Sequence, residues 1–235
     1  MPSPAVLYEK DGPLAIVSLN RPTMRNAYNV EMRDDLYEIL QAVRDDPEVR
    51  VMILRGEGPA FSTGGDVSEF GSAPSPVRAR EVRWRRDNWG TLLHLPQPTI
   101  AAVHGYTVGG GMEMALLCDI CIAADDTVFF LPETSLGMIP GVAGTQTAPR
   151  AIGLGRALDM VLTGRQVKAD EALQIGLANQ VVPRATLLTA AKSLAYTLSR
   201  YDPKVVALAK RAVRQGGDLS LSDGLRLEQN LFAMV

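Results

Sequence analysis

The sequence has few of the residues on which several large protein classes depend. Its 235 residues include only two cysteines, Cys118 and Cys121, and two histidines, His94 and His104. Two cysteines cannot cross-link a disulfide-rich scaffold, and these four side chains stand in no spacing typical of a closed metal site. We therefore expect no bound metal, and we interpret both cysteines as core residues.

A strong charge of one sign and long hydrophobic runs are also missing. The net charge is −2, which gives no indication of a nucleic-acid partner. No apolar run approaches the ~20 residues of a membrane span, and residues 1–10 lack the charged-then-apolar order of a signal peptide. Apolar residues at 46% and charged residues at 21% are typical of a folded globular protein, which we expect to be cytoplasmic.

The order of short apolar runs and helical patterns favours an α/β fold with a parallel or mixed sheet. An amphipathic helix is expected at 30–45, where Met32, Leu36, Leu40 and Val43 recur at helical spacing. Further helices are expected at 112–118, 143–151 and 156–162, and strands at 14–19, 49–55, 99–103, 119–123 and 127–131, with a small strand pair at 164–167 and 179–182.

Two segments change this pattern. After a Ser-, Pro- and Gly-rich loop at 67–76, residues 77–95 carry several arginines and both tryptophans, and we expect a helix there. From Thr186 onward only helices are expected, at 187–200, 203–215 and 220–233. The sequence therefore predicts a core over residues 1–185 and a helical C-terminal region over residues 186–235.

A glycine run between a strand and a helix is the first segment that suggests chemistry. Gly109, Gly110 and Gly111 precede an apolar helix, so free amide N–H groups are expected at the helix start, at the positive end of the helix dipole. Glu113 follows Gly110 by three residues, about one turn. An anion-stabilising donor and a proton-transfer group are therefore expected in one cavity.

A second segment, Pro59-Ala-Phe-Ser-Thr-Gly-Gly-Asp66, follows a strand and contains another pair of glycines. The amide of Gly65 is a candidate second donor to an oxyanion, and loss of one such donor typically costs ~10²–10³ in rate. Asp66 is suited to cap the next turn. An ordinary strand-to-helix turn is the alternative, and no lysine followed by serine or threonine is present to make it a nucleotide loop.

A third segment places a carboxylate in apolar surroundings. Glu133 stands beside Pro132 and near Ile139, and a glycine-rich turn follows. Poor solvation and a neighbouring carboxylate both raise the pKa of an acid, so Glu113 and Glu133 around one water can act as an acid and a base together. Either glutamate alone is equally compatible with a surface or capping role.

Together these segments resemble the crotonase superfamily, which contains the enoyl-CoA hydratases and isomerases. The resemblance runs from Leu14-Ala-Ile-Val-Ser-Leu-Asn-Arg-Pro22 to Gly176-Leu-Ala-Asn-Gln-Val-Val-Pro183. Stretches between these limits that also match are Arg25-Asn-Ala27, Ala60-Phe-Ser-Thr-Gly-Gly-Asp66, Pro98-Thr-Ile-Ala-Ala-Val-His-Gly105, Cys118-Asp119, Ile122-Ala-Ala124 and Leu162-Thr-Gly164.

The resemblance implies a spiral of β-β-α units with a helical C-terminal region, and a coenzyme A (CoA) thioester as the substrate, without a further cofactor. By position, the thioester oxygen is expected between the amides of Gly65 and Gly110, with Glu113 and Glu133 as the two hydratase carboxylates. The residues expected to bind the CoA or acyl part are Arg25, Ala27, Thr63, Gly64, Asp66, Val67, Pro132 and Gly141.

The activity that the resemblance implies is hydration of a trans-2-enoyl-CoA in fatty acid metabolism, with Glu113 activating water and Glu133 donating a proton. Relatives that only move a double bond often lack the first glutamate, so the presence of both favours hydration. Double-bond isomerisation, C–C cleavage, decarboxylation and non-catalytic acyl-CoA binding remain alternatives. Family members form trimers or dimers of trimers, so a homo-oligomer is expected.

Two departures from the family are visible. Gly65 replaces a more common alanine, and the segment 67–86, expected to wall the acyl pocket and to set substrate choice, is the least familiar. A further helix usually follows the stretch similar to 220–235 and is not in this sequence. The remaining candidates are expected to be structural, with His104 bonded to the backbone, Trp84 and Trp89 packed, and the arginines of 78–86 mostly solvated rather than bound to CoA phosphates.

Overall fold

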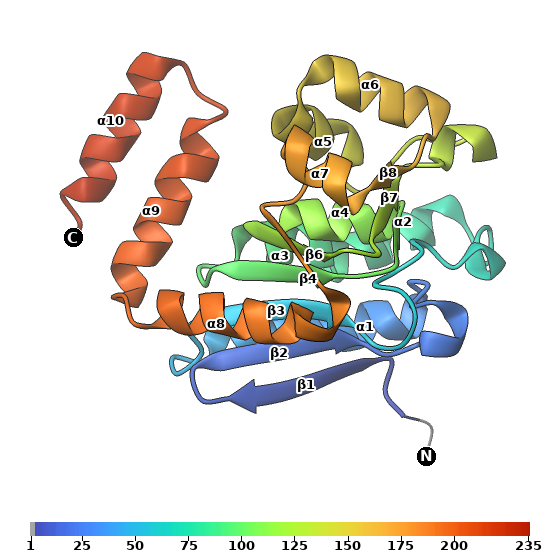
Figure 1. The fold of residues 1–235 in the computed structure, drawn as a ribbon, viewed down its shortest axis with the longest axis horizontal. Coiled ribbons are helices and arrows are strands. Elements are labelled where there is room, and N and C mark those ends of the chain that lie inside the picture. Colours follow the sequence, from blue (N-terminus) through green and yellow to red (C-terminus); the bar gives the residue numbers. More distant parts are fainter. Residues whose placement is uncertain (1–2) are drawn as a thin grey trace.

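The computed structural model describes residues 3–235, which form an α/β fold around a six-stranded sheet (Figure 1). The first two strands form an antiparallel hairpin, and the remaining neighbours are parallel. The order is β1 (Val6–Asp11), β2 (Leu14–Leu19), β3 (Val51–Gly56), β4 (Thr99–Val103), β6 (Ile120–Ala124) and β9 (Gln180–Val182). The prediction of an α/β fold with a mixed sheet is confirmed.

A second, three-stranded sheet consists of β5 (Tyr106–Val108), β7 (Val128–Phe130) and β8 (Val167–Lys168). Only His104 and Gly105 separate β4 from β5, and a short turn separates β6 from β7, so each of these strands continues into the second sheet before a helix begins. This is the β-β-α repeat of the predicted spiral. It brings the end of β5 to the start of α4 (Gly110–Leu117).

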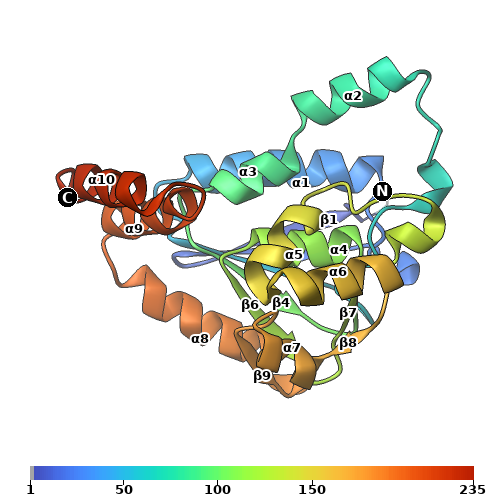
Figure 2. The ribbon, with the colours of Figure 1, turned by 90° about the horizontal axis from the view of Figure 1, so that it is seen from above.

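Helices cover both faces of the large sheet because its strands are apolar on both sides. Met52 and Leu54 face the core that α1 (Val30–Asp45), α3 (Asn88–His94) and α4 close. Val51 and Ile53 face the opposite side, against α8 (Leu187–Ser199). Figure 2 shows α8 on one side of the sheet and α1 and α3 on the other.

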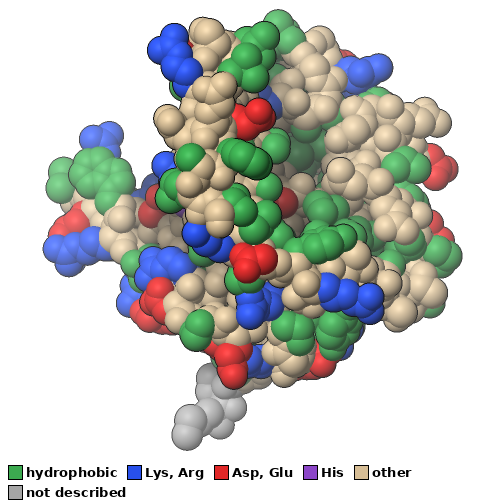
Figure 3. Space-filling view, turned by 90° about the vertical axis from the view of Figure 1, so that its left-hand side faces the viewer, with side chains coloured by type: hydrophobic (Ala, Val, Ile, Leu, Met, Phe, Trp, Pro, Cys, Tyr) green, Lys and Arg blue, Asp and Glu red, His purple; other side chains and the backbone are tan. Residues whose placement is uncertain are grey.

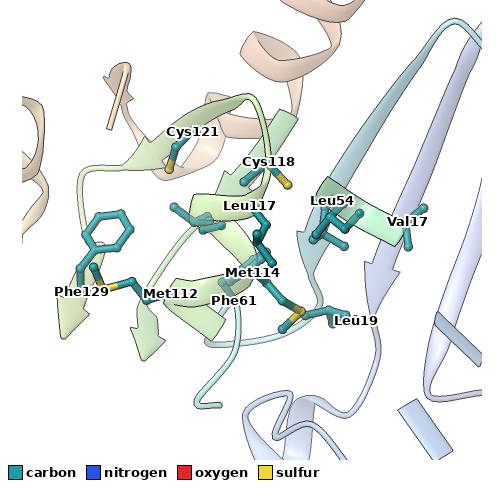
Figure 4. Packing of buried hydrophobic residues seen from close by; sticks show 14 of the residues in the cluster. Val17, Leu19, Leu54, Phe61, Met112, Met114, Leu117, Cys118, Cys121 and Phe129 are labelled. Carbon is teal, nitrogen blue, oxygen red and sulfur yellow. The ribbon is translucent and has the colours of Figure 1, made fainter. Parts of the chain in front are cut away.

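Both cysteines lie in the larger core cluster, as predicted. Cys118 caps the C-terminal end of α4 and Cys121 lies in β6, both are buried free thiols, and Figure 4 shows Cys118 beside Leu117. Burial raises the pKa of each thiol to about 12. Neither thiol is therefore a nucleophile at neutral pH.

From Gly144 onward the chain is helical apart from β8 and β9, with α5 (Gly144–Ile152), α6 (Leu154–Thr163), α7 (Ala169–Ile175), α8, α9 (Pro203–Gly216) and α10 (Leu221–Phe232). The last two helices, α9 and α10, form a hairpin that projects from the body (Figure 1). Lys210 and Arg214 of the hairpin each lie 2.7 Å from a carboxylate oxygen of Asp119. Within residues 3–235 no helix is long and apolar enough to cross a membrane.

The structure corrects two local predictions and adds three elements. The expected strand pair does not form, since β8 pairs with β7 and β9 pairs with β6. The arginine-rich segment is two helices, α2 (Pro76–Arg85) and α3, because the Asp87 side chain accepts the Gly90 N–H and caps a new helix. β1, β5 and α7 were not predicted. The division at residue 185 stays a prediction.

Candidate active site

Two glycine-bearing segments meet where β5 ends and α4 begins. Ser62 pairs with β5 in parallel, and Val108 N–H donates to Ser62 O at 2.9 Å. This pairing places Gly65 beside Gly110, since a Cβ built on Gly110 would lie 3.8 Å from the Gly65 nitrogen. The two amides singled out in the sequence therefore lie side by side.

Neither of these amides donates to a protein acceptor within residues 3–235. Gly110 is the first residue of α4, and a first-turn N–H has no partner inside its own helix. Beside Gly65, the carbonyl of Gly64 accepts from Tyr28 at 2.7 Å and the N–H of Asp66 donates to Tyr28 at 2.9 Å, which leaves the Gly65 N–H free. Two adjacent free donors are what an oxyanion requires.

A buried asparagine holds the segment that carries Gly65. Asn26 is fully buried and has a left-handed φ of 54°. Its side chain accepts from Arg21 N–H at 2.8 Å and donates to the carbonyls of Glu57 and Ala60 at 2.9 and 2.8 Å. Its own carbonyl accepts from the Ser62 hydroxyl at 2.8 Å. The 62–65 turn is thus fixed by internal polar bonds.

Glu113 is 1% exposed and is held by the main chain of a neighbouring loop. Its Oε1 accepts three amide N–H groups, from Val142 at 3.0 Å, Ala143 at 2.9 Å and Gly144 at 2.6 Å. Gly144 begins α5, so the carboxylate also caps the positive end of that helix. One carboxylate oxygen is fully used, and Oε2 is the atom left for chemistry.

Glu133 is the first residue of a short 3₁₀ helix, η3 (Glu133–Leu136). Within residues 3–235 its buried Oε2 has no hydrogen-bond partner. Burial raises the pKa of Glu133, and the negative charge of Glu113 raises it further. Glu133 therefore keeps its proton to a higher pH than an ordinary glutamate, whereas Oε1 of Glu113 is occupied by three amide N–H groups.

Gly109 explains how Glu133 approaches the free amides. Its φ is 51°, and a Cβ at this position would lie 2.5 Å from Glu133 Oε1. Any side chain here would collide with the carboxyl group. The carboxyl group of Glu133 thus lies against the residue that precedes Gly110, and the site can present an acid, a carboxylate and two amide donors to one substrate.

The other predicted residues surround this centre. Arg25 is exposed, has a left-handed φ of 51°, and its guanidinium lies 5.7 Å from the centre of the Tyr106 ring. Its carbonyl accepts the Thr63 N–H at 3.1 Å. The segment 25–27 and the turn 63–67 are thus adjacent, as the predicted CoA site requires.

A half-buried ion pair fixes the end of that turn. Asp66 is 6% exposed and lies 3.0 Å from Arg21, which also donates to the Ala27 carbonyl at 2.6 Å. Hydrogen bonds from Ser68 and Arg21 lower the pKa of Asp66. The Asp66 carboxylate is therefore occupied by protein groups, whereas the neighbouring Val67 is 67% exposed.

Pro132, Gly64 and Gly141 complete the predicted set. Pro132 immediately precedes Glu133, and Gly64, with a φ of 85°, packs against Gly110 so closely that a Cβ would lie 3.0 Å from its nitrogen. Gly141 is exposed and accepts a hydrogen bond from Arg83 at 2.5 Å. The roles of all these residues in binding or catalysis stay predictions.

Sequence reasoning missed several residues on which the site depends. The partners of Glu113 at 142–144 are main-chain groups, which carry no side-chain signal. Asn26 was quoted only as part of a matching stretch, although a lone asparagine between turn residues is a common sign of a left-handed backbone. Gly109 was predicted only as part of the glycine run before the helix, because its closeness to Glu133 depends on a contact between segments distant in the sequence.

His104 lies in a different cavity, of about 140 Å³, between β3, β4 and the start of α8. Its Nε2 lies 3.0 Å from the Gly58 carbonyl, as predicted, and Arg55 and Arg184 also line this space. Burial lowers the pKa of His104. Neither glutamate lines this cavity, and within residues 3–235 no group of histidines, cysteines or acids is placed to hold a metal ion.

Comparisons with known proteins find similar proteins over nearly the whole chain. Residues 9–235 match the family model described as enoyl-CoA hydratase/isomerase. A probable enoyl-CoA hydratase from Mycobacterium bovis is 39% identical over 227 residues, 97% of this chain and 88% of that protein. The 2,3-dehydroadipyl-CoA hydratase of Escherichia coli is 37% identical over 220 residues, 94% of this chain and 86% of that protein.

A solved structure supports the same conclusion for the fold. The crystal structure of an enoyl-CoA hydratase from Bacillus anthracis matches with a TM-score of 0.93 and 35% identity, covering 98% of this chain and 90% of that chain. The α/β core with C-terminal helices is therefore the crotonase fold, as predicted.

Proposed function

Because the chain belongs to the enoyl-CoA hydratase/isomerase family, we propose that it is an enoyl-CoA hydratase, which adds water across the 2,3 double bond of a trans-2-enoyl-CoA. The observation that carries this proposal is the position of two glutamates, one of them with an unpartnered buried oxygen, beside two free main-chain amides. Relatives named as hydratases support the reaction class.

In the proposed reaction the thioester oxygen accepts hydrogen bonds from the amides of Gly65 and Gly110. Glu113, fixed through Oε1, takes a proton from water with Oε2, and the hydroxide adds to the β-carbon. The electrons of the double bond move onto the thioester oxygen as an enolate, which the two amides stabilise. Glu133 then donates its proton to the α-carbon, and the proton on Glu113 restores Glu133.

Isomerisation of a double bond is the second candidate, and one observation favours it. Glu133 alone combines a raised pKa with an unpartnered oxygen, so it can carry a proton between two carbons without help from water. In this reaction Glu113 would serve only as the cap of α5. The two candidates therefore differ in whether Oε2 of Glu113 takes part.

The mass of the product distinguishes the candidates. A panel of 2-enoyl and 3-enoyl CoA thioesters of graded size is incubated with the protein, and the products are read by mass spectrometry. Hydration adds the mass of one water, whereas isomerisation leaves the mass unchanged. A Glu113→Gln variant that keeps full activity on a 3-enoyl thioester would replace the hydratase by the isomerase, and binding without turnover of any thioester would indicate a binding protein.

We also propose that the protein is a homo-oligomer, a trimer or a dimer of trimers, that assembles through the α9–α10 hairpin. Val213, Leu221 and Phe232 on this hairpin are each at least 78% exposed. Figure 3, which faces the α10 side, shows hydrophobic side chains interleaved with charged ones on this surface. Light scattering should give a multiple of the 25.3 kDa chain mass, and Phe232→Lys should lower it. The cytoplasmic location and the role in fatty acid metabolism stay predictions.

A further inference from the structure

α2 carries a groove that the proposed hydration does not use. The groove has a volume of about 370 Å³ and is lined by Ala79, Arg80, Arg83 and Trp84. The Arg80 guanidinium lies 5.7 Å from the centre of the Trp84 ring, and Trp84 is 72% exposed although it was expected to be packed. Trp89, by contrast, packs against Tyr28 with ring centres 5.0 Å apart. α2 lies at the edge of the molecule in Figure 2.

The arginines in the groove differ from their neighbours in their charge partners. Arg78 and Arg85 both pair with Glu81, and Arg86 pairs with Glu38 at 2.8 Å. Within residues 3–235 neither Arg80 nor Arg83 lies within ion-pair distance of a carboxylate. The two unpaired cations of this segment are therefore the two that line the groove, and they are available to an anion.

Two contacts relate α2 (Pro76–Arg85) and the segment before it to the candidate active site. On the N-terminal side, Phe70 lies against Gly65, where a Cβ would meet the ring at 3.0 Å. On the C-terminal side, Arg83 donates to the Gly141 carbonyl at 2.5 Å, and the next residue, Val142, donates to Glu113. The groove thus adjoins the site on the side of Glu113, whereas Arg25 lies on the segment expected to hold CoA.

From this placement we propose that the groove selects the substrate: Arg80 and Arg83 bind a carboxylate at the far end of the acyl chain, while Trp84 packs against the chain. The inference rests on the proposed hydratase function and narrows its substrate to thioesters of dicarboxylic acids. Two arginines provide the planar donors that carboxylates prefer. The phosphates of CoA are the other possible source of an anion, and the experiment distinguishes the two.

The test compares pairs of 2-enoyl-CoA thioesters of equal chain length, one ending in a methyl group and the other in a carboxylate. We expect kcat/KM to be about 10- to 100-fold higher for the carboxylate at the best chain length, since hydrogen bonds to a charged group are of this strength. Arg80→Gln should remove most of this preference, because it lowers kcat/KM far more for the carboxylate-ended thioester than for the methyl-ended one. Arg80→Glu should reverse the preference.

Arg85→Gln is the matched control, because Arg85 is on the same helix but pairs with Glu81 outside the groove. This variant should keep the wild-type preference. Binding of saturated thioesters, measured by calorimetry, provides a readout that needs no turnover, and the carboxylate-ended ester should bind more tightly to the wild type than to Arg80→Gln.

Two results would overturn the inference, and a third would overturn only the proposed function. Equal kcat/KM and equal binding for the two ends would show that the groove does not read the acyl terminus, with hydration itself intact. An equal loss on both thioesters in Arg80→Gln would assign the groove to the CoA phosphates. If no enoyl thioester is hydrated, the proposed function fails, and the binding measurement still decides whether the groove takes a carboxylate.

Discussion

The two ends of the proposed substrate site are built in different ways. Around Gly65, Gly110 and Glu113 the functional groups are main-chain amides and a carboxylate buried among them. On α2 the groups are the long side chains of Arg80 and Arg83 on an exposed helix, whereas Glu81 pairs with Arg78 and Arg85 outside the groove. The first arrangement holds positions and tolerates little change, whereas the second can change its charge pattern without a change in the fold.

The largest effect is expected when the buried end is broken at Glu133. Glu133→Gln keeps the shape of the side chain but removes its proton-transfer role, so kcat should fall by roughly 10²–10⁴-fold while affinity for a saturated CoA thioester is kept. Stopped hydration assays and calorimetry check this. Glu9→Gln, at an exposed position on β1, is the control and should match the wild type; full activity in Glu133→Gln would remove this residue from the mechanism.

A methyl group at Gly109 should break the same end without a change in any functional group. Gly109→Ala forces alanine into a left-handed φ, which costs about 1–2 kcal/mol, and pushes the Glu133 carboxyl group away, which should lower kcat by about 10²-fold. Gly12→Ala has the same backbone problem, with a φ of 56° and nothing near its Cβ. If the two variants lose activity equally, the contact with Glu133 has no catalytic role.

Substitutions at the two ends should also differ in how much they lower the free energy of unfolding. Asn26→Ala leaves the buried carbonyl of Ala60 and the N–H of Arg21 without partners, so unfolding in urea should show a loss of about 2–4 kcal/mol. Arg85→Ala on α2 removes one exposed ion pair and should stay within about 0.5 kcal/mol of the wild type. Similar losses in the two variants would contradict the contrast between a buried scaffold and a replaceable surface.

The smallest expected effect is the pH dependence of Glu133. Burial raises its folded-state pKa above the usual value of 4.5, so the folded state binds more protons than the unfolded chain and loses stability as pH rises through the raised pKa. Relative to Glu133→Gln, the wild type should therefore be more stable below this range than above it. Urea unfolding at a series of pH values measures the difference, and a parallel pH profile for both proteins would disprove it.

Much of this architecture can be predicted from local patterns. Glycines before an apolar helix predict free amides, and alternating strands and helices predict a layered sheet. Both features depend on residues that are neighbours in the sequence. The partners of β8 and β9 could not be predicted from local patterns, because the sequence of two short strands separated by α7 does not indicate which sheet each strand joins. The same holds for the amides at 142–144, whose function comes only from the distant Glu113.

Glu113 combines a proposed role in the reaction with a structural role as the acceptor of three amide N–H groups. If Glu113 were lost, the start of α5 would be left with three donors and no acceptor: the N–H of Gly144, which is buried, and those of Val142 and Ala143, which are half-buried. A new acceptor, or a redrawn loop at 142–144, must arise first or at the same time. If Glu113 activates water as proposed, the loss of this role therefore also requires a change in the loop at 142–144.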